Sequence, residues 1–129
     1  PTDLIAVGAG PGGGPVVVAY NPDGTERFRR FAFDPAYSGG VTAATGDLNG
    51  DGVEDVVAGS AVGASRITVF DGRTGSELAT FFAFADFAGG VNVAVAGGKI
   101  VAGAGVGGGP VVAMFVLAPG GVREVARFA

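Results

Sequence analysis

The chain has 129 residues, of which 48% are hydrophobic, 16% are charged and 26 are glycine. This length suits one modest domain. The apolar content is too high for ordinary disorder, and the glycine content disfavours a fold dominated by regular helix. The formal net charge is −4 and no cysteine or histidine is present. These facts argue against nucleic acid as the main partner and exclude disulfides, thiolate zinc sites, cysteine nucleophiles and Ser-His triads.

The first forty residues predict three short strands bounded by glycine, proline, asparagine and aspartate. Residues 8–13 satisfy the GxGxxG pattern after an apolar run, which raises the alternative of a dinucleotide site. Such a fingerprint must open a helix, whereas residues 14–20 read as a β-strand. We therefore interpret these glycines as small residues that let strands approach closely.

Three arginines follow in this unit, Arg27, Arg29 and Arg30, and they flank Phe28. Their alternation with an aromatic residue predicts one solvated strand face. The alternative is a binding surface for an anionic glycan or a carboxylate.

The middle part of the chain predicts four strands, because four β-rich runs are separated by turn signals. These runs cover residues 41–45, 55–59, 66–70 and 77–82. Residues 71–75, with the sequence DGRTG, form a suitable hairpin connection between the last two strands.

Between the first two of these strands lies the segment 47–55, DLNGDGVED, in which oxygen-bearing side chains occupy positions 1, 3, 5 and 9. Calcium prefers six to eight oxygen ligands, and alternate residues of a tight loop can direct oxygens to one point. Glycine at position 6 can adopt positive φ and turn the following carbonyl inward. The pattern predicts a Ca²⁺ site formed by the side chains of Asp47, Asn49, Asp51 and Asp55 and the Val53 carbonyl.

Two alternatives to this metal site follow from the same residues. An EF-hand would require glutamate at position 12, which is Ala58 inside a predicted strand. A plain polar turn would not need three carboxylates within nine residues, since these repel one another unless a cation joins them. The third unit has only AGGK (residues 96–99) at the equivalent place, with Lys99 at the position of Asp55. The hairpin can therefore form without the acidic loop.

The chain repeats with a period of roughly 45 to 50 residues, which is typical of propeller blades. Residues 30–33 match 81–84 and 127–129, residues 38–41 match 88–91, and residues 8–17 match 103–112. We expect all-β architecture, with β-propeller-type blades of four antiparallel strands in units of about 1–40, 41–90 and 91–129. The recurring phenylalanines are expected to pack between blades, with a ligand platform as the alternative: Phe31, Phe33, Phe82, Phe84 and Phe128.

The middle unit resembles an FG-GAP (VCBS-type) repeat, the blade of integrin-α-like β-propellers, and the match extends from Phe33 to Phe84. The motifs that carry the resemblance are GGV at 39–41, GD at 46–47, NGDG at 49–52, DVV at 55–57 and VFDG at 69–72. The resemblance implies one calcium site in the loop 47–55. The outer units match more weakly: the first keeps only Asp3, aligned with Asp55, and the third keeps no side-chain ligand.

The resemblance further implies a calcium-binding, non-catalytic module of extracellular or cell-surface adhesion or recognition, with a protein or glycan ligand. The alternative is an accessory or substrate-positioning propeller of a secreted carbohydrate-active enzyme. Two carboxylates would be the only catalytic pair that this composition allows, but no spacing among Asp34, Asp86 and Glu124 supports an acid/base pair. No catalytic residue, nucleic-acid partner or membrane insertion is predicted.

Closure of a propeller typically requires four to eight blades, whereas this chain encodes about three. An open array of blades exposes apolar faces and strand edges. We therefore expect either further blades in a longer chain or a homo-oligomer, and a dimer for the isolated chain.

Overall fold

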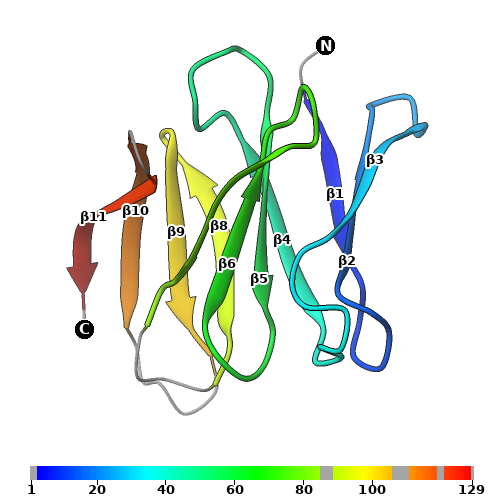
Figure 1. Ribbon diagram of the computed structural model, residues 1–129. Helices are drawn as coiled ribbons and strands as arrows, with labels where there is room; N and C mark the ends of the chain where they lie inside the picture. The colour runs from blue at the N-terminus through cyan, green and yellow to red at the C-terminus, as the bar shows by residue number, and fades with distance from the viewer. Residues whose placement is uncertain (1–2, 85–88, 106–110, 119–120, 129) are drawn as a thin grey trace.

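Eleven strands form three antiparallel sheets that stand side by side in the computed structural model (Figure 1). The structure describes residues 3–84, 89–105, 111–118 and 121–128. No helix occurs among these residues. The prediction of an all-β chain built from propeller-type blades with three, four and four strands is confirmed.

Each sheet is an up-and-down meander in which consecutive strands pair. The first sheet contains β1 (Ile5–Gly8), β2 (Val16–Tyr20) and β3 (Glu26–Phe31). The middle sheet contains β4 (Val41–Gly46), β5 (Asp55–Ser60), β6 (Arg66–Phe70) and β7 (Glu77–Phe82). The third sheet contains β8 (Val91–Ala96), β9 (Lys99–Ala104), β10 (Val112–Ala118) and β11 (Gly121–Phe128).

The glycine-rich segment after β1 leads into β2 and not into a helix. This excludes the dinucleotide interpretation of residues 8–13, because that site needs a helix N-terminus. A side chain at Gly8 would overlap the backbone of Val41 in β4, and one at Gly46 would overlap Val95 in β8. Small residues therefore allow the inner strands of neighbouring sheets to approach closely, as predicted. The second glycine-rich copy lies partly outside the described residues.

A β-bulge interrupts the pairing of the last two strands of each sheet, β2 with β3, β6 with β7 and β10 with β11. It falls directly before Tyr20 in the first sheet, before Phe70 in the middle sheet and before Phe115 in the third sheet. These three aromatic residues are therefore equivalent, and they fix the residue-by-residue correspondence of the three repeats.

The pairing corrects the alignment of Asp3. Ile5 in the first sheet is equivalent to Val56 in the middle sheet. Ile5 pairs with Tyr20 and Val56 pairs with Phe70, and each of these aromatic residues directly follows the bulge. Leu4, and not Asp3, therefore corresponds to Asp55. Asp3 is exposed before the first strand begins. The sequence match pairs Asp3 with Asp55 because both are aspartates, whereas the strand register places Asp3 one residue before the position of Asp55.

Two apolar cores join the sheets. One lies between the first and middle sheets and includes Val17, Ala19 and Phe28 on one side and Val56 and Phe70 on the other. The second lies between the middle and third sheets, and its members are Val57, Ile67, Val69, Ala83, Phe84, Val91, Ile100, Ala102, Ala113 and Phe115. Both faces of the middle sheet are thus buried, which accounts for the fully buried pattern of β5.

The prediction for the phenylalanines is only partly correct. Phe84 is buried, and Phe33 packs against the core between the first and middle sheets. Phe31, Phe82 and Phe128 are instead more than half exposed. Phe31 and Phe82 end the outermost strands, where side chains alternate between the core and solvent, so recurrence in the sequence did not indicate burial.

Candidate functional site

The predicted calcium loop connects β4 to β5 at one end of the middle sheet, at the top of Figure 1. Gly46 pairs with Asp55 across the base of the hairpin, so residues 47–54 form the loop. Gly50 and Gly52 have φ values of +76° and +82°, which L side chains rarely adopt. The prediction that Gly52 adopts positive φ is confirmed, and Gly50 is a second position in the loop where the backbone requires glycine.

The loop is organised by hydrogen bonds from its own amides to its polar side chains. Asp47 accepts from the Gly50 amide at 2.9 Å and from the Gly52 amide at 3.0 Å. Asn49 Oδ1 accepts from the Asp51 amide at 3.3 Å, and Asp51 Oδ1 accepts from the Val53 amide at 3.0 Å. Three predicted ligand residues thus turn side-chain oxygens toward the backbone of the same loop, which holds it in a wound conformation.

Asp55 anchors the loop to the sheet from a fully buried position. Its Oδ2 accepts from the Leu48 amide at 2.8 Å, and its Oδ1 accepts from the Gly72 amide at 3.0 Å. Burial raises the pKa of this carboxyl above its usual value. The hydrogen bonds from the Gly72 and Leu48 amides lower the pKa in part, and the negative charge of Asp51 raises it. Asp55 therefore ties three segments together: the start of the loop, β5 and the β6–β7 turn.

A residue that the sequence did not single out completes the environment of the loop. Arg73, in the β6–β7 turn, donates from Nε to Asp51 Oδ2 at 3.1 Å and from its terminal nitrogen to the Asp51 carbonyl at 3.2 Å. The sequence showed DGRTG only as a hairpin connection. Its proximity to the acidic loop depends on the return of β6 beside β5, which places both connections at the same end of the sheet.

The donor set fits a hard cation in its chemistry, because all five predicted ligands are oxygens and three carry negative charge. Each carboxylate oxygen that accepts one amide keeps a further lone pair for a metal. Within the part of the chain that the structure describes, however, no three His, Cys, Asp or Glu side chains are grouped so that they could hold an ion. The second oxygen of Asp51, Oδ2, pairs with Arg73.

The equivalent hairpins in the outer sheets have no such set of ligands. In the third sheet, Ala96 pairs with Lys99 and a two-residue Gly97-Gly98 turn replaces the loop, as predicted. In the first sheet, Leu4 occupies the position of Asp55 and is buried in the core, while its amide donates to Glu54 Oε1 at 2.7 Å. The acidic loop is thus specific to the middle repeat among the described residues.

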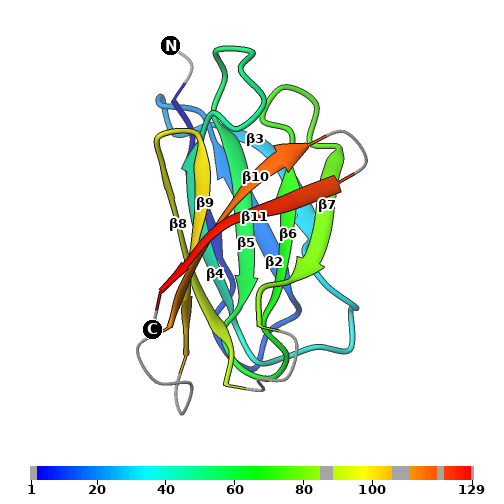
Figure 2. The ribbon, with the colours of Figure 1, turned by 90° about the vertical axis from the view of Figure 1, so that its left-hand side faces the viewer.

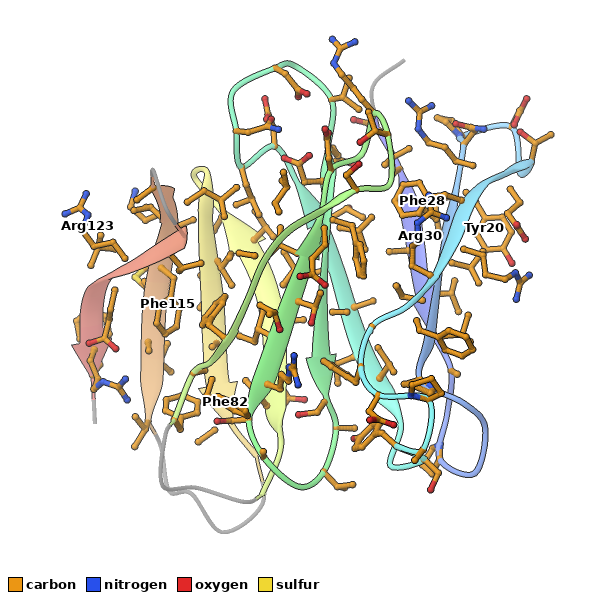
Figure 3. All side chains as sticks on the ribbon, in the orientation of Figure 1. Tyr20, Phe28, Arg30, Phe82, Phe115 and Arg123 are labelled. Atoms are coloured by element: carbon orange, nitrogen blue, oxygen red, sulfur yellow. The ribbon has the colours of Figure 1, made fainter. Side chains whose placement is uncertain are left out.

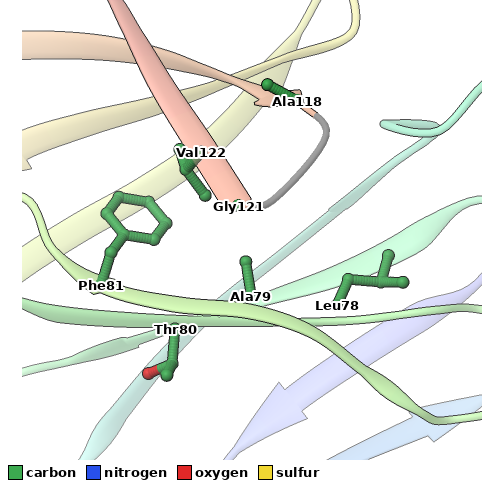
Figure 4. Close-up of a pocket in the computed structure, with 7 residues that line it drawn as sticks. All are labelled: Leu78, Ala79, Thr80, Phe81, Ala118, Gly121 and Val122. Atoms are coloured by element: carbon green, nitrogen blue, oxygen red, sulfur yellow. The ribbon is translucent and has the colours of Figure 1, made fainter.

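Hollows lie between neighbouring sheets in the described part of the chain, and two of them are lined as follows. The larger, about 520 Å³, separates β7 from the β10–β11 hairpin (Figure 4) and is lined by Leu78, Ala79, Thr80, Phe81, Ala118, Gly121 and Val122. The smaller, about 240 Å³, lies where the first and middle sheets meet and is lined by Phe33, Asp34, Tyr37, Ser60, Ala64, Arg66 and Phe82. In the smaller one, the rings of Phe33 and Tyr37 meet edge to face, and the Arg66 guanidinium lies 5.8 Å from the Phe82 ring centre.

The arginines of β3 serve mainly to join sheets. Arg27 donates to the Gly72 carbonyl at 2.6 Å, and Arg30 donates to the Gly75 carbonyl at 3.0 Å. Arg29 pairs with Glu26 at 2.8 Å within its own strand. All three side chains reach solvent, as predicted for a solvated face, but two of them also bind the β6–β7 turn of the middle sheet.

Comparison with known families agrees with this arrangement. Residues 39–70, from the segment before β4 to the end of β6, match the FG-GAP repeat. The chain therefore carries an FG-GAP repeat in its middle sheet, and the predicted resemblance is confirmed. No solved structure matches the chain. Among the described residues, no helix is long and apolar enough to cross a membrane.

Proposed function

We propose that this β-propeller-type module binds calcium through the β4–β5 loop and acts in recognition of a protein or glycan outside the cell, without catalysis. The observation that carries the proposal is the loop itself. Its four polar side chains stand at positions 1, 3, 5 and 9 of a segment that is wound around its own amides and lies inside the matched FG-GAP repeat. Calcium sites of extracellular modules commonly have dissociation constants of about 10⁻⁴–10⁻³ M, which suits a loop partly open to solvent.

The residues that would hold the ion are Asp47, Asn49, Asp51 and Asp55 with the Val53 carbonyl. The bound ion would supply positive charge that offsets the repulsion among three carboxylates. Asp51 would exchange its ion pair with Arg73 for the metal. Asp55 already fixes the base of the loop through two backbone amides, so it would link the metal to the sheet.

The non-catalytic part of the proposal is supported by the surroundings of the carboxylates that could in principle act as acid and base. Glu124 pairs with Arg127 on the exposed strand β11, and Asp34 accepts the Ala36 amide at 2.9 Å. Asp86 lies outside the described residues. A recognition role is supported by the aromatic rings of the smaller hollow, which are typical of surfaces that bind ligands.

Thermal unfolding in chelator and in calcium tests the proposal. Calcium at about 100 times its dissociation constant is expected to stabilise the native state by about 2.7 kcal/mol. Asp51→Ala should abolish this effect because it removes a ligand, whereas Lys99→Ala and Asp23→Ala should retain it. Asp23 is an exposed aspartate in another turn, so its variant controls for the change in net charge. Equal melting temperatures of the unmutated protein in both solutions would show that the loop is an ordinary turn.

A further inference from the structure

The two internal contacts between sheets use the same pair of faces. Face A is defined by the residue that follows the bulge and by its neighbours on the same side of the sheet: Ile5, Val7 and Tyr20 in the first sheet, Val56, Ala58 and Phe70 in the middle sheet, and Ile100, Ala102 and Phe115 in the third sheet. Face B is the opposite side: Ala6, Val17 and Ala19, then Val57, Ile67, Val69 and Phe81, then Val101, Val112, Met114 and Phe128.

Face B of one sheet packs on face A of the next at both contacts. The core between the first and middle sheets contains Val17 and Ala19 from face B together with Val56 and Ala58 from face A. The core between the middle and third sheets contains Ile67 and Val69 from face B together with Ile100, Ala102 and Phe115 from face A. The molecule therefore repeats one heterologous contact, in which the two surfaces are different and complementary.

The same two faces remain uncovered at the outer sides of the three-sheet array. Face A of the first sheet exposes Ile5 and Val7 at 53% and 50%, although their equivalents in the middle and third sheets are fully buried. Tyr20 projects on the same side, away from the middle sheet (Figure 3). An apolar patch of this kind on a sheet face is typical of an interaction surface.

Face B of the third sheet is the complementary surface, and it faces the viewer in Figure 2. The count from the bulge makes Phe128 equivalent to Phe81, and not to Phe82 as the sequence alignment had it. Phe81 packs on the ring of Phe115, with ring centres 4.9 Å apart, whereas Phe128 is 58% exposed. By analogy with Phe81, Phe128 would pack on an aromatic residue equivalent to Phe115. Tyr20, on the uncovered face A of the first sheet, is equivalent to Phe115.

We infer that a second copy of this chain docks head to tail, with face B of its third sheet on face A of the first sheet. The occupant is argued from the internal contacts, in which each face binds the opposite face of another sheet, and a second copy supplies both faces. Each copy offers one face of each kind, so two copies can form this contact twice. The result is a closed ring of six sheets, within the four to eight blades common in propellers. The contact includes no residue of the β4–β5 loop and does not depend on calcium.

Light scattering after size exclusion, over a range of concentrations and in both chelator and calcium, tests this inference. The unmutated chain should give about 25 kDa, twice the chain mass of 12.5 kDa. Ile5→Glu on face A and Phe128→Lys on face B should each weaken the dimer at least about 100-fold, since each would bury an unpaired charge. Both positions are more than half exposed in the single chain, so neither change should prevent folding, and circular dichroism checks this.

Two further arms separate the docking contact from a general effect of charge. Val62→Glu alters an equally exposed apolar residue, 51%, in the β5–β6 connection, and it should leave the dimer intact. An equimolar mixture of Ile5→Glu and Phe128→Lys should restore a 25 kDa species, because one contact of the mixed dimer is unaltered and the other pairs opposite charges. The inference is wrong if the unmutated chain stays at 12.5 kDa or forms open polymers. It is also wrong if Val62→Glu dissociates the dimer or the mixture stays monomeric.

Discussion

The same hairpin position carries two different connections in neighbouring sheets. Between β4 and β5 the chain uses eight residues, 47–54, whereas between β8 and β9 it uses only Gly97 and Gly98. Both connections lie at the same end of the array, and both join strands that pair in the same register relative to the bulge (Figure 1). The hairpin therefore needs only two glycines, and the six additional residues of the middle repeat are not required to form it.

What the additional residues contribute is a network of polar contacts. The loop brings three carboxylates together with the amides of Gly50, Gly52 and Val53, and it reaches the β6–β7 turn through Arg73 and Gly72. The short turn makes no such connection, and Lys99 holds the place of Asp55. The comparison indicates that a blade of this chain can form without the acidic loop, so the loop is an addition to a completed sheet.

The change that should cost the most stability falls on this equivalent pair, Asp55 and Lys99. Asp55→Ala leaves the Leu48 and Gly72 amides without their acceptor, and Gly72 is buried, so the free energy of unfolding should fall by about 3 kcal/mol even in chelator. Lys99→Ala, at the same place in the third sheet, should change it by less than about 0.5 kcal/mol. Urea denaturation of both variants measures the difference.

Asp55→Asn serves as the control for size, since an amide retains one acceptor oxygen and should restore part of the lost stability. A cost for Asp55→Ala no larger than that for Lys99→Ala would mean that Asp55 does not anchor the loop.

The sequence predicted the sheets well because their signals are local. Strand runs, turn residues and the acidic spacing in 47–55 are all read within a few residues, and the strands of the middle sheet agree with prediction to within one residue. Arg73 was missed because its contact with Asp51 joins segments 22 residues apart. Phe31 and Phe82 were placed in the core because recurrence reports a repeated position and not the side of the strand. Asp3 and Phe128 were misaligned because residue identity hides a one-residue shift in register.

A smaller effect is expected at the glycines of the two connections. Gly52 has φ +82° and Gly97 has φ +58°, and neither would bring a Cβ within 4 Å of another residue. Alanine at either position should therefore cost about 1 kcal/mol in chelator, from the backbone conformation alone. Gly52→Ala should in addition reduce the stabilisation by calcium, because Gly52 shapes the loop and donates to Asp47. Gly97→Ala should leave that increment unchanged, and equal increments in the two variants would contradict a metal site in the loop.

Arg73 should contribute little to stability, but it separates the two connections by their affinity for calcium. Its side chain is 57% exposed, so its ion pair with Asp51 should contribute less than about 1 kcal/mol in chelator. If the proposed site binds calcium, Arg73→Gln removes a cation that would compete for Asp51, so calcium should bind a few-fold more tightly by titration calorimetry. Arg29→Gln is the matched control, because it changes the net charge by the same amount. Arg29 is 58% exposed, pairs with Glu26 and lies outside the loop. If both variants bind calcium equally, the gain comes from net charge, and Arg73 has no specific part. If Arg73→Gln alone gains affinity, the Asp51 carboxylate alternates between two cations, one supplied by the neighbouring turn and one by the solution.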